Sequence, residues 1–118
     1  MVTGTKTAYI TTKYLDYLDE HAWTFQSGYT WSWYAGHVEN NYFQPYYCWA
    51  IDGWYSFDNH DTGGGWVTWN GNSHGEWHAW EKEQVHYAVL KVGVVQTWYI
   101  TNDFYVYADG HYTWHHSE

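Results

Sequence analysis

The chain has 118 residues, of which 29 are aromatic (11 Trp, 14 Tyr and 4 Phe), whereas Val, Leu and Ile together number only 15. This length predicts a single domain over residues 1–118 with a core of ordinary size. Four Lys and no Arg against 13 carboxylates give a formal net charge of -9, which excludes a cationic face for the phosphates of nucleic acid. No apolar run approaches the length of a membrane span.

The single cysteine, Cys48, excludes an intramolecular disulfide framework and is expected to act as a small buried apolar residue. The first ten residues contain neither the basic nor the apolar segment of a signal peptide. Many Trp, Tyr, Thr and Gly residues with few charges favour an extracellular protein. Of the two alternatives, a cytosolic chain and a mature secreted chain whose signal peptide has been replaced by Met1, we therefore expect the second.

The N-terminal third contains one helix candidate and one clear strand. Over residues 12–20, apolar side chains fall at helical spacing and a threonine at the start could cap the helix. Over residues 29–33, large aromatic residues alternate with Thr and Ser. An alternation of this kind is the period of a half-buried strand.

Turn signals divide the remainder of the chain into short runs rich in aromatic and β-branched residues. The signals lie at residues 26–28, 52–53, 61–65, 70–71 and 109–110. This spacing is typical of an all-β fold. We predict a single-domain antiparallel β-sandwich, jelly-roll-like in its topology, or a small barrel built from hairpins.

Residues 52–53, Asp-Gly, are predicted to form a two-residue hairpin turn, because both tolerate the positive φ that such a turn needs. This hairpin would pair Ile51 with Trp54 and every residue outward in step. Aromatic side chains would then lie on both of its faces, with Cys48 on the face opposite Ile51.

Residues 94–108 show the longest strand-like alternation. The even positions, which include Trp98, Ile100 and Phe104, are expected to face the core. The odd positions hold mostly Thr and Tyr, with one Asp, and are expected to face water.

A two-residue turn at residues 109–110 would pair Ala108 with His111 and continue outward in step. The predicted cross-strand pairs are Tyr107 with Tyr112, Tyr105 with Trp114, Asp103 with His116, Val106 with Thr113 and Phe104 with His115. One face of this hairpin would therefore carry an aromatic ladder. Because rings fall on both faces of both hairpins, we infer that one face meets something other than the domain's own core.

Flat Trp and Tyr rings can stack on the C–H face of a pyranose while nearby Asp, Asn or Thr groups bind its hydroxyls. The row along residues 94–108 and the glycine-rich segment 54–69 both combine these groups. The expected function is therefore non-enzymatic binding of carbohydrate, as in a lectin or carbohydrate-binding module, or of another small ligand with polar and apolar faces. The predicted ligand-binding residues are Trp54, Asp58, Asn59, Trp66, Trp69, Tyr99, Asp103, Tyr105, Tyr107, Tyr112 and Trp114.

His74, Glu76 and His78 are spaced so that a strand would place all three on one face. Two imidazoles and a carboxylate are suitable zinc ligands. The same spacing arises by chance on the exposed strands of a His-rich chain, so a solvated face is the simpler expectation. Residues 58–63 lack the spacing of an EF-hand, and calcium there would need another geometry. The expected binding function requires no cofactor.

Two alternatives compete with ligand binding. Large aromatic patches favour a self-associating subunit of a homo-oligomer or filament. The chain has only four Lys, the residue that most often prevents exposed strand edges from pairing with another chain. A small metal-dependent or glycan-acting enzyme would instead need two carboxylates across a cleft. Glu76, Glu81 and Asp103 each follow or precede an aromatic residue, but neighbours on a strand point to opposite faces, so this adjacency is weak support.

Overall fold

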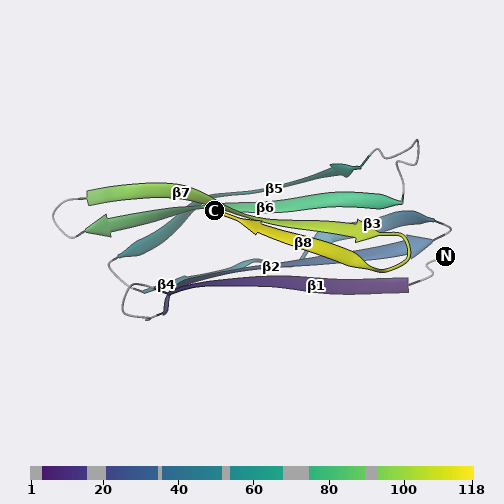
Figure 1. Ribbon diagram of the computed structural model, residues 1–118, viewed down its shortest axis with the longest axis horizontal. Helices are drawn as coiled ribbons and strands as arrows, with labels where there is room; N and C mark the ends of the chain where they lie inside the picture. Colours follow the sequence, from purple (N-terminus) through teal and green to yellow (C-terminus); the bar gives the residue numbers. More distant parts are fainter. Residues whose placement is uncertain (1–3, 16–20, 35, 52–53, 68–74, 90–92) are drawn as a thin grey trace.

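The computed structural model describes residues 4–15, 21–34, 36–51, 54–67, 75–89 and 93–118. Within these ranges, antiparallel strands form two four-stranded sheets that pack face to face (Figure 1). The molecule measures 57 × 22 × 21 Å. The predicted antiparallel β-sandwich is confirmed, and the sheets do not close into a barrel. The described residues include no helix that is long and apolar enough to cross a membrane.

Sheet A comprises β1 (Gly4–Leu15), β2 (His21–Tyr34), β3 (His37–Phe43) and β4 (Tyr47–Ala50). β1 pairs along almost the whole of β2, while β3 and β4 share the other edge of β2. β2 is therefore the central strand. Its residues Trp23, Phe25, Ser27, Tyr29 and Trp31 face the sandwich core, and Thr24, Gly28, Thr30 and Ser32 lie on the outer side of the sheet.

Sheet B comprises β5 (Tyr55–Trp66), β6 (Glu76–Val89), β7 (Gly93–Tyr107) and β8 (Tyr112–Ser117), in that spatial order. Each sheet thus consists of four consecutive strands, which is a simpler order than that of a jelly roll. The hairpin predicted at residues 52–53 is wrong. β4 pairs with β2 and β5 pairs with β6, so the chain passes from one sheet to the other here.

The described part of the predicted helix and two of the predicted turns are also strands in the structure. Residues 12–15, predicted to start a helix, continue β1 opposite β2. The turns predicted at residues 26–28 and 61–65 lie within β2 and β5. Gly28, Gly63 and Gly64 make room there for aromatic rings: a Cβ on Gly28 would lie 2.5 Å from a ring carbon of Tyr9. The predicted turn at residues 70–71 lies outside the described residues.

The turn between β7 and β8 has three residues instead of the predicted two. The Tyr107 N–H donates to the His111 carbonyl (3.1 Å), and Gly110 adopts a φ of 93°. Phe104 is consequently paired with Trp114, not with His115. A shift of one residue turns every side chain of a strand to the other face. The predicted aromatic ladder of residues 105, 107, 112 and 114 is therefore wrong.

The core consists of two apolar clusters separated by a polar belt. One cluster contains Tyr29, Trp31, Ala79, Phe104 and Val106 among others, and the second contains Ala22, Trp23, Phe25, Val85 and Ile100. The polar belt, which lies between them on β2, β6 and β7, consists of the buried residues Ser27, Glu81, Glu83 and Asn102. The prediction that even positions of β7 face the core is confirmed for residues 98–106.

Candidate functional site

The outer face of sheet B carries a cross-strand row with one residue from each strand. Gly63 of β5 pairs with Trp80 of β6, Trp80 pairs with Asp103 of β7, and Asp103 pairs with His115 of β8. Since directly paired residues in an antiparallel sheet point to the same side, all four lie on one surface.

The Trp80 ring lies flat against the sheet because Gly63 has no side chain. A Cβ on Gly63 would lie 2.2 Å from Cζ2 of Trp80, so only glycine accommodates the ring in this position. The Lys82 ammonium lies 5.7 Å from the Trp80 ring centre and 4.9 Å from that of Tyr99. Two rings and a cation thus adjoin one another on this surface.

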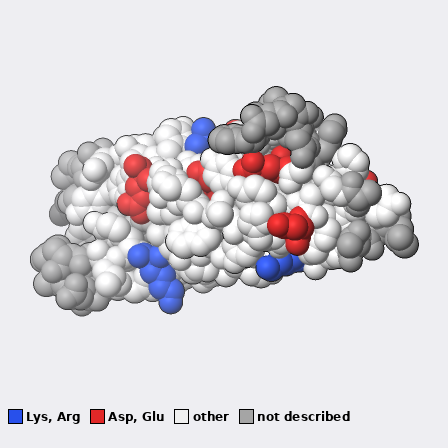
Figure 2. Space-filling model, turned by 45° about the vertical axis from the view of Figure 1, so that its right-hand side comes forward, with Lys and Arg blue, Asp and Glu red and all other residues white. Residues whose placement is uncertain are grey.

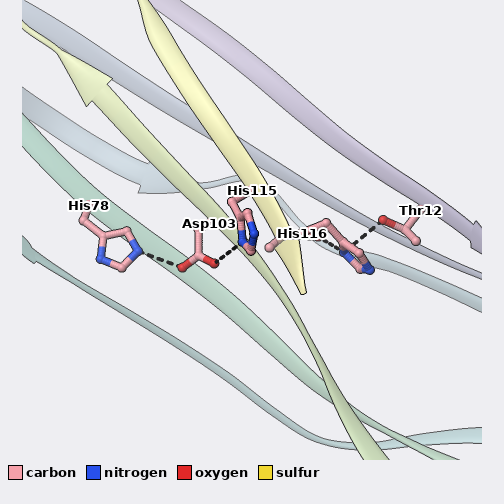
Figure 3. A network of polar contacts seen from close by, with 6 residues as sticks. Thr12, His78, Asp103, His115 and His116 are labelled. Atoms are coloured by element: carbon pink, nitrogen blue, oxygen red, sulfur yellow. Dashed lines mark hydrogen bonds and ion pairs between the residues drawn. The ribbon is translucent and has the colours of Figure 1, made fainter. Parts of the chain in front are cut away.

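Asp103 is held between two imidazoles, as Figure 3 shows. Its Oδ1 lies 2.7 Å from Nε2 of His78, and its Oδ2 lies 3.9 Å from Nδ1 of His115. The His78 ring stacks on Tyr105 with a centroid distance of 4.4 Å and an interplanar angle of 7°. The carboxylate is therefore fixed in position, while its side chain keeps 16% of its surface exposed.

We call this surface the Trp80 face, and it consists of His78, Trp80, Lys82, Tyr99, Asp103 and Tyr105. The structure brings together three predicted ligand-binding residues here, Tyr99, Asp103 and Tyr105. Tyr107 follows on the same side of β7 and stacks on His111 at 3.9 Å. Sequence reasoning missed Trp80 and Lys82, although their even-numbered positions on β6 alternate with the buried residues Ala79 and Val85.

Several predicted ligand-binding residues lie elsewhere. Tyr112 and Trp114 are on the opposite side of sheet B, where Tyr112 packs against Trp31 with ring centres 5.6 Å apart. The segment 54–66 is mostly an edge strand and not a loop. Its predicted residues are spread along that edge: Trp54 beside Tyr87, Asp58 and Asn59 at a register shift, and Trp66 against Trp77. Trp69 lies outside the described residues.

The predicted metal site is only partly described. Glu76 and His78 point to the same outer face of β6, as their spacing predicts, and His74 lies outside the described residues. The His78 imidazole binds the Asp103 carboxylate. Within the described ranges, no group of three or more His, Cys, Asp or Glu side chains is arranged to hold a metal ion.

The polar belt forms a second cluster of titratable groups. Nε2 of His60, from an irregularity of β5, lies 2.8 Å from Oε2 of Glu81, and the His60 ring stacks on Tyr46 at 3.7 Å. Glu81 and Glu83 are 1% and 3% exposed. Burial raises the pKa of both carboxyl groups, that of Glu83 to about 7, and raises the pKa of the Cys48 thiol to about 12.

Hydrogen bonds extend the polar belt to the other side of the sandwich. The Asn102 amide donates to Oγ of Ser27 (2.9 Å), and its Oδ1 lies 2.7 Å from Nδ1 of His116. The same nitrogen of His116 lies 3.1 Å from Oγ1 of Thr12 (Figure 3). The belt thus connects β1, β2, β5, β6, β7 and β8. Sequence reasoning missed it because carboxylates are expected to face water.

The candidate catalytic carboxylates do not flank one cleft. Glu81 faces the core, while its neighbour Trp80 faces outward, and Glu76 and Asp103 lie on the outer face of sheet B.

Comparison of the chain with known protein families, with curated proteins and with solved structures finds no match in any of the three.

Proposed function

We propose that the protein binds carbohydrate through the Trp80 face. The observation that carries this proposal is the direct pairing of Trp80 with Asp103, which places a flat indole ring beside a fixed carboxylate. A pyranose has the matching pair of surfaces, a weakly apolar C–H face and a rim of hydroxyl donors.

The roles of the individual groups follow from their chemistry. The sugar ring stacks on the half-buried Trp80 indole, which lies against Gly63 on the side of the sheet. The Asp103 carboxylate accepts hydrogen bonds from two hydroxyls, and charge-assisted bonds of this kind are stronger than neutral ones. The Lys82 ammonium donates to ring or hydroxyl oxygens on the other side, and Tyr99 extends the platform along β7.

The charge of sheet B indicates which sugars bind. Asp61, Glu76 and Asp103 lie on or beside the outer surface, with Lys82 as the one lysine of the four strands. Uronic acids and sulfated sugars would meet like charges here, which disfavours them. We therefore expect neutral glycans as ligands.

A titration of neutral oligosaccharides, read out by tryptophan fluorescence and preceded by a glycan-array screen, tests the proposal. Trp80→Ala and Asp103→Asn should each weaken binding about tenfold or more. Trp114→Ala is the matched control, because this ring is 59% exposed but lies on the other side of the sheet. The proposal is wrong if no neutral glycan binds, or if the control variant loses as much affinity as Trp80→Ala.

A further inference from the structure

The outer face of sheet A presents several large, exposed rings. Tyr9, Tyr42, Tyr47 and Trp49 are 57%, 55%, 51% and 40% exposed. Each is paired with a small or polar residue of β2 that points outward, so all four lie on the same surface. We call this surface the sheet A face.

Polar side chains between these rings bind one another. Hydroxyl pairs join Thr5 with Ser32 (2.9 Å) and Thr7 with Thr30 (2.7 Å), and the Gln44 amide also donates to Thr30 (2.7 Å). These bonds satisfy part of the hydrogen-bonding capacity of each group, which lowers the cost of covering it. The surface therefore combines exposed rings with polar groups that are already hydrogen-bonded to one another.

Charge is divided unequally between the two sheets. The described strands of sheet A carry two lysines and one carboxylate, of which Lys6 points to the core side; those of sheet B carry one lysine and six carboxylates, of which Glu81 and Glu83 face the core and four lie on the outer side. The residues are Lys6, Lys13 and Glu39 in sheet A, and Lys82, Asp58, Asp61, Glu76, Glu81, Glu83 and Asp103 in sheet B. In Figure 2, Lys side chains lie along the lower side of the molecule and at its upper edge, with Asp and Glu side chains between them.

The two charges on the sheet A face are placed symmetrically. Lys13 is paired with Thr24 of β2, and Glu39 is paired with Ser32. Midway between these positions is Gly28, which is paired with Tyr9 and covered by its ring. A two-fold axis near Tyr9 therefore brings Lys13 of each copy opposite Glu39 of the other. A surface that complements itself in this way is the requirement of a symmetric dimer interface.

We propose that the sheet A face is the interface of a homodimer, with a second copy of the chain packed on it around a two-fold axis near Tyr9. The 14 residues of β2, at about 3.3 Å each, and three strand positions about 4.8 Å apart give roughly 700 Å² per copy. The total of about 1,400 Å² is the size of a stable protein interface. Its rings and few charges match the composition of interface centres.

This arrangement also accounts for the distribution of charge. Each molecule is 21 to 22 Å across its short axes, so the acidic outer faces of the two copies lie farther apart than the screening length of about 10 Å. The opposite arrangement, with two sheet B faces in contact, would place the carboxylates against one another. The proposal does not depend on glycan binding, and it leaves both Trp80 faces open on opposite sides of the dimer.

Sedimentation equilibrium and light scattering from low micromolar to millimolar concentration test the proposal. We expect the mass to rise with concentration from 14.1 kDa toward twice this value. Lys13→Glu and Glu39→Lys should each raise the dissociation constant about tenfold, because either variant creates two like-charge pairs. The double variant restores the pairs with reversed sign and should recover affinity close to that of the unchanged chain.

Asp61→Lys is the matched control, since it makes an equal change of charge on an exposed residue of sheet B and should leave the dissociation constant unchanged. A mass of 14.1 kDa at every concentration would overturn the proposal. So would a dimer that is insensitive to both charge reversals. A monomer whose glycan affinity falls in Trp49→Ala would instead assign this face to a ligand.

Discussion

Nε2 of His60 lies 2.8 Å from Oε2 of Glu81, inside a sandwich whose core is otherwise apolar on both sides of this contact. The Glu81 carboxylate is almost completely buried, and Glu83 lies two residues further along the same face of β6. Oε2 of Glu83 has no hydrogen-bond partner among the described residues. Removing a carboxylate from water favours its protonated form, so the polar belt makes the stability of the fold depend on pH.

Glu83→Gln tests this dependence. Burial raises the pKa of Glu83 from 4.5 to about 7, so between these pH values the folded chain keeps a proton that the unfolded chain loses. The free energy of unfolding should therefore fall as pH rises through this window, by on the order of 2 to 3 kcal/mol, and level off above pH 7. Urea denaturation at pH 5, 6, 7 and 8 should show that Glu83→Gln lacks the part of the fall that Glu83 contributes and keeps only that of Glu81, whose pKa is also raised by burial.

Asp61→Asn is the control, because it removes an exposed carboxylate from β5 and should keep the pH profile of the unchanged chain. Glu83→Gln should be more stable than the unchanged chain at pH 8 and similar to it at pH 5. Parallel pH profiles for the two chains would contradict the role given to Glu83.

Ser27→Ala tests the hydrogen bonds of the polar belt. The Ser27 hydroxyl accepts a hydrogen bond from the Asn102 amide at 2.9 Å, and both residues are 0% exposed. Alanine leaves this amide buried without its partner, which should cost about 1 to 3 kcal/mol of unfolding free energy. Thr11→Ala, which removes an exposed hydroxyl bonded to Gln26, should cost less than about 0.5 kcal/mol. Equal losses in urea denaturation would count against the prediction.

Gly63→Ala and Gly65→Ala form a matched pair on one strand. A Cβ on Gly63 would lie 2.2 Å from the Trp80 ring, whereas a Cβ on Gly65 meets no atom within 4 Å. We expect Gly63→Ala to lose about 1 to 3 kcal/mol of stability and to displace the indole, which should also weaken glycan binding. Gly65→Ala should raise stability by about 0.5 kcal/mol through the unfolded state. If both variants behave alike, Gly63 does not position the ring.

Strand periodicity predicted the parts of the fold that depend on a single strand. The alternation of β7 predicts which side chains are buried, from Ile100 to Val106, because a sheet with one covered face imposes a period of two. Pairing between strands was harder to predict. The sequence Asp-Gly at residues 52–53 is compatible with a hairpin, but β4 gains its partner from β2, more than twenty residues earlier in the chain.

The candidate site, too, could be predicted only where it depends on a single strand. Asp103 and Tyr105 were predicted from their own strand, but their neighbours on the Trp80 face come from β6 through a register that no local signal specifies. The glycines at residues 63–65 resemble a loop, and the space that Gly63 and Gly64 leave for the Trp80 and Trp77 rings is visible only once β5 lies beside β6. Glu81 was considered only for its aromatic neighbour in the sequence, and its contact with His60 comes from another strand that no local pattern indicates.

Gly110→Ala and Gly36→Ala separate backbone strain from crowding. Both glycines have a positive φ, 93° at Gly110 and 81° at Gly36, which costs a residue with a Cβ about 1 to 2 kcal/mol. A Cβ on Gly110 would also lie 2.7 Å from the Trp33 ring, whereas one on Gly36 meets no atom within 4 Å.

We expect Gly36→Ala to show the backbone cost alone and Gly110→Ala to lose about 1 to 3 kcal/mol more. Trp33 packs against the core, so Trp33→Leu has a cost of its own; measured in the Trp33→Leu chain, Gly110→Ala should cost no more than Gly36→Ala does, because the smaller side chain removes the overlap. Thermal and urea denaturation of the unchanged chain, the three single variants and the double variant give the comparison, and equal losses at the two glycines would show that Trp33 does not constrain the β7–β8 turn.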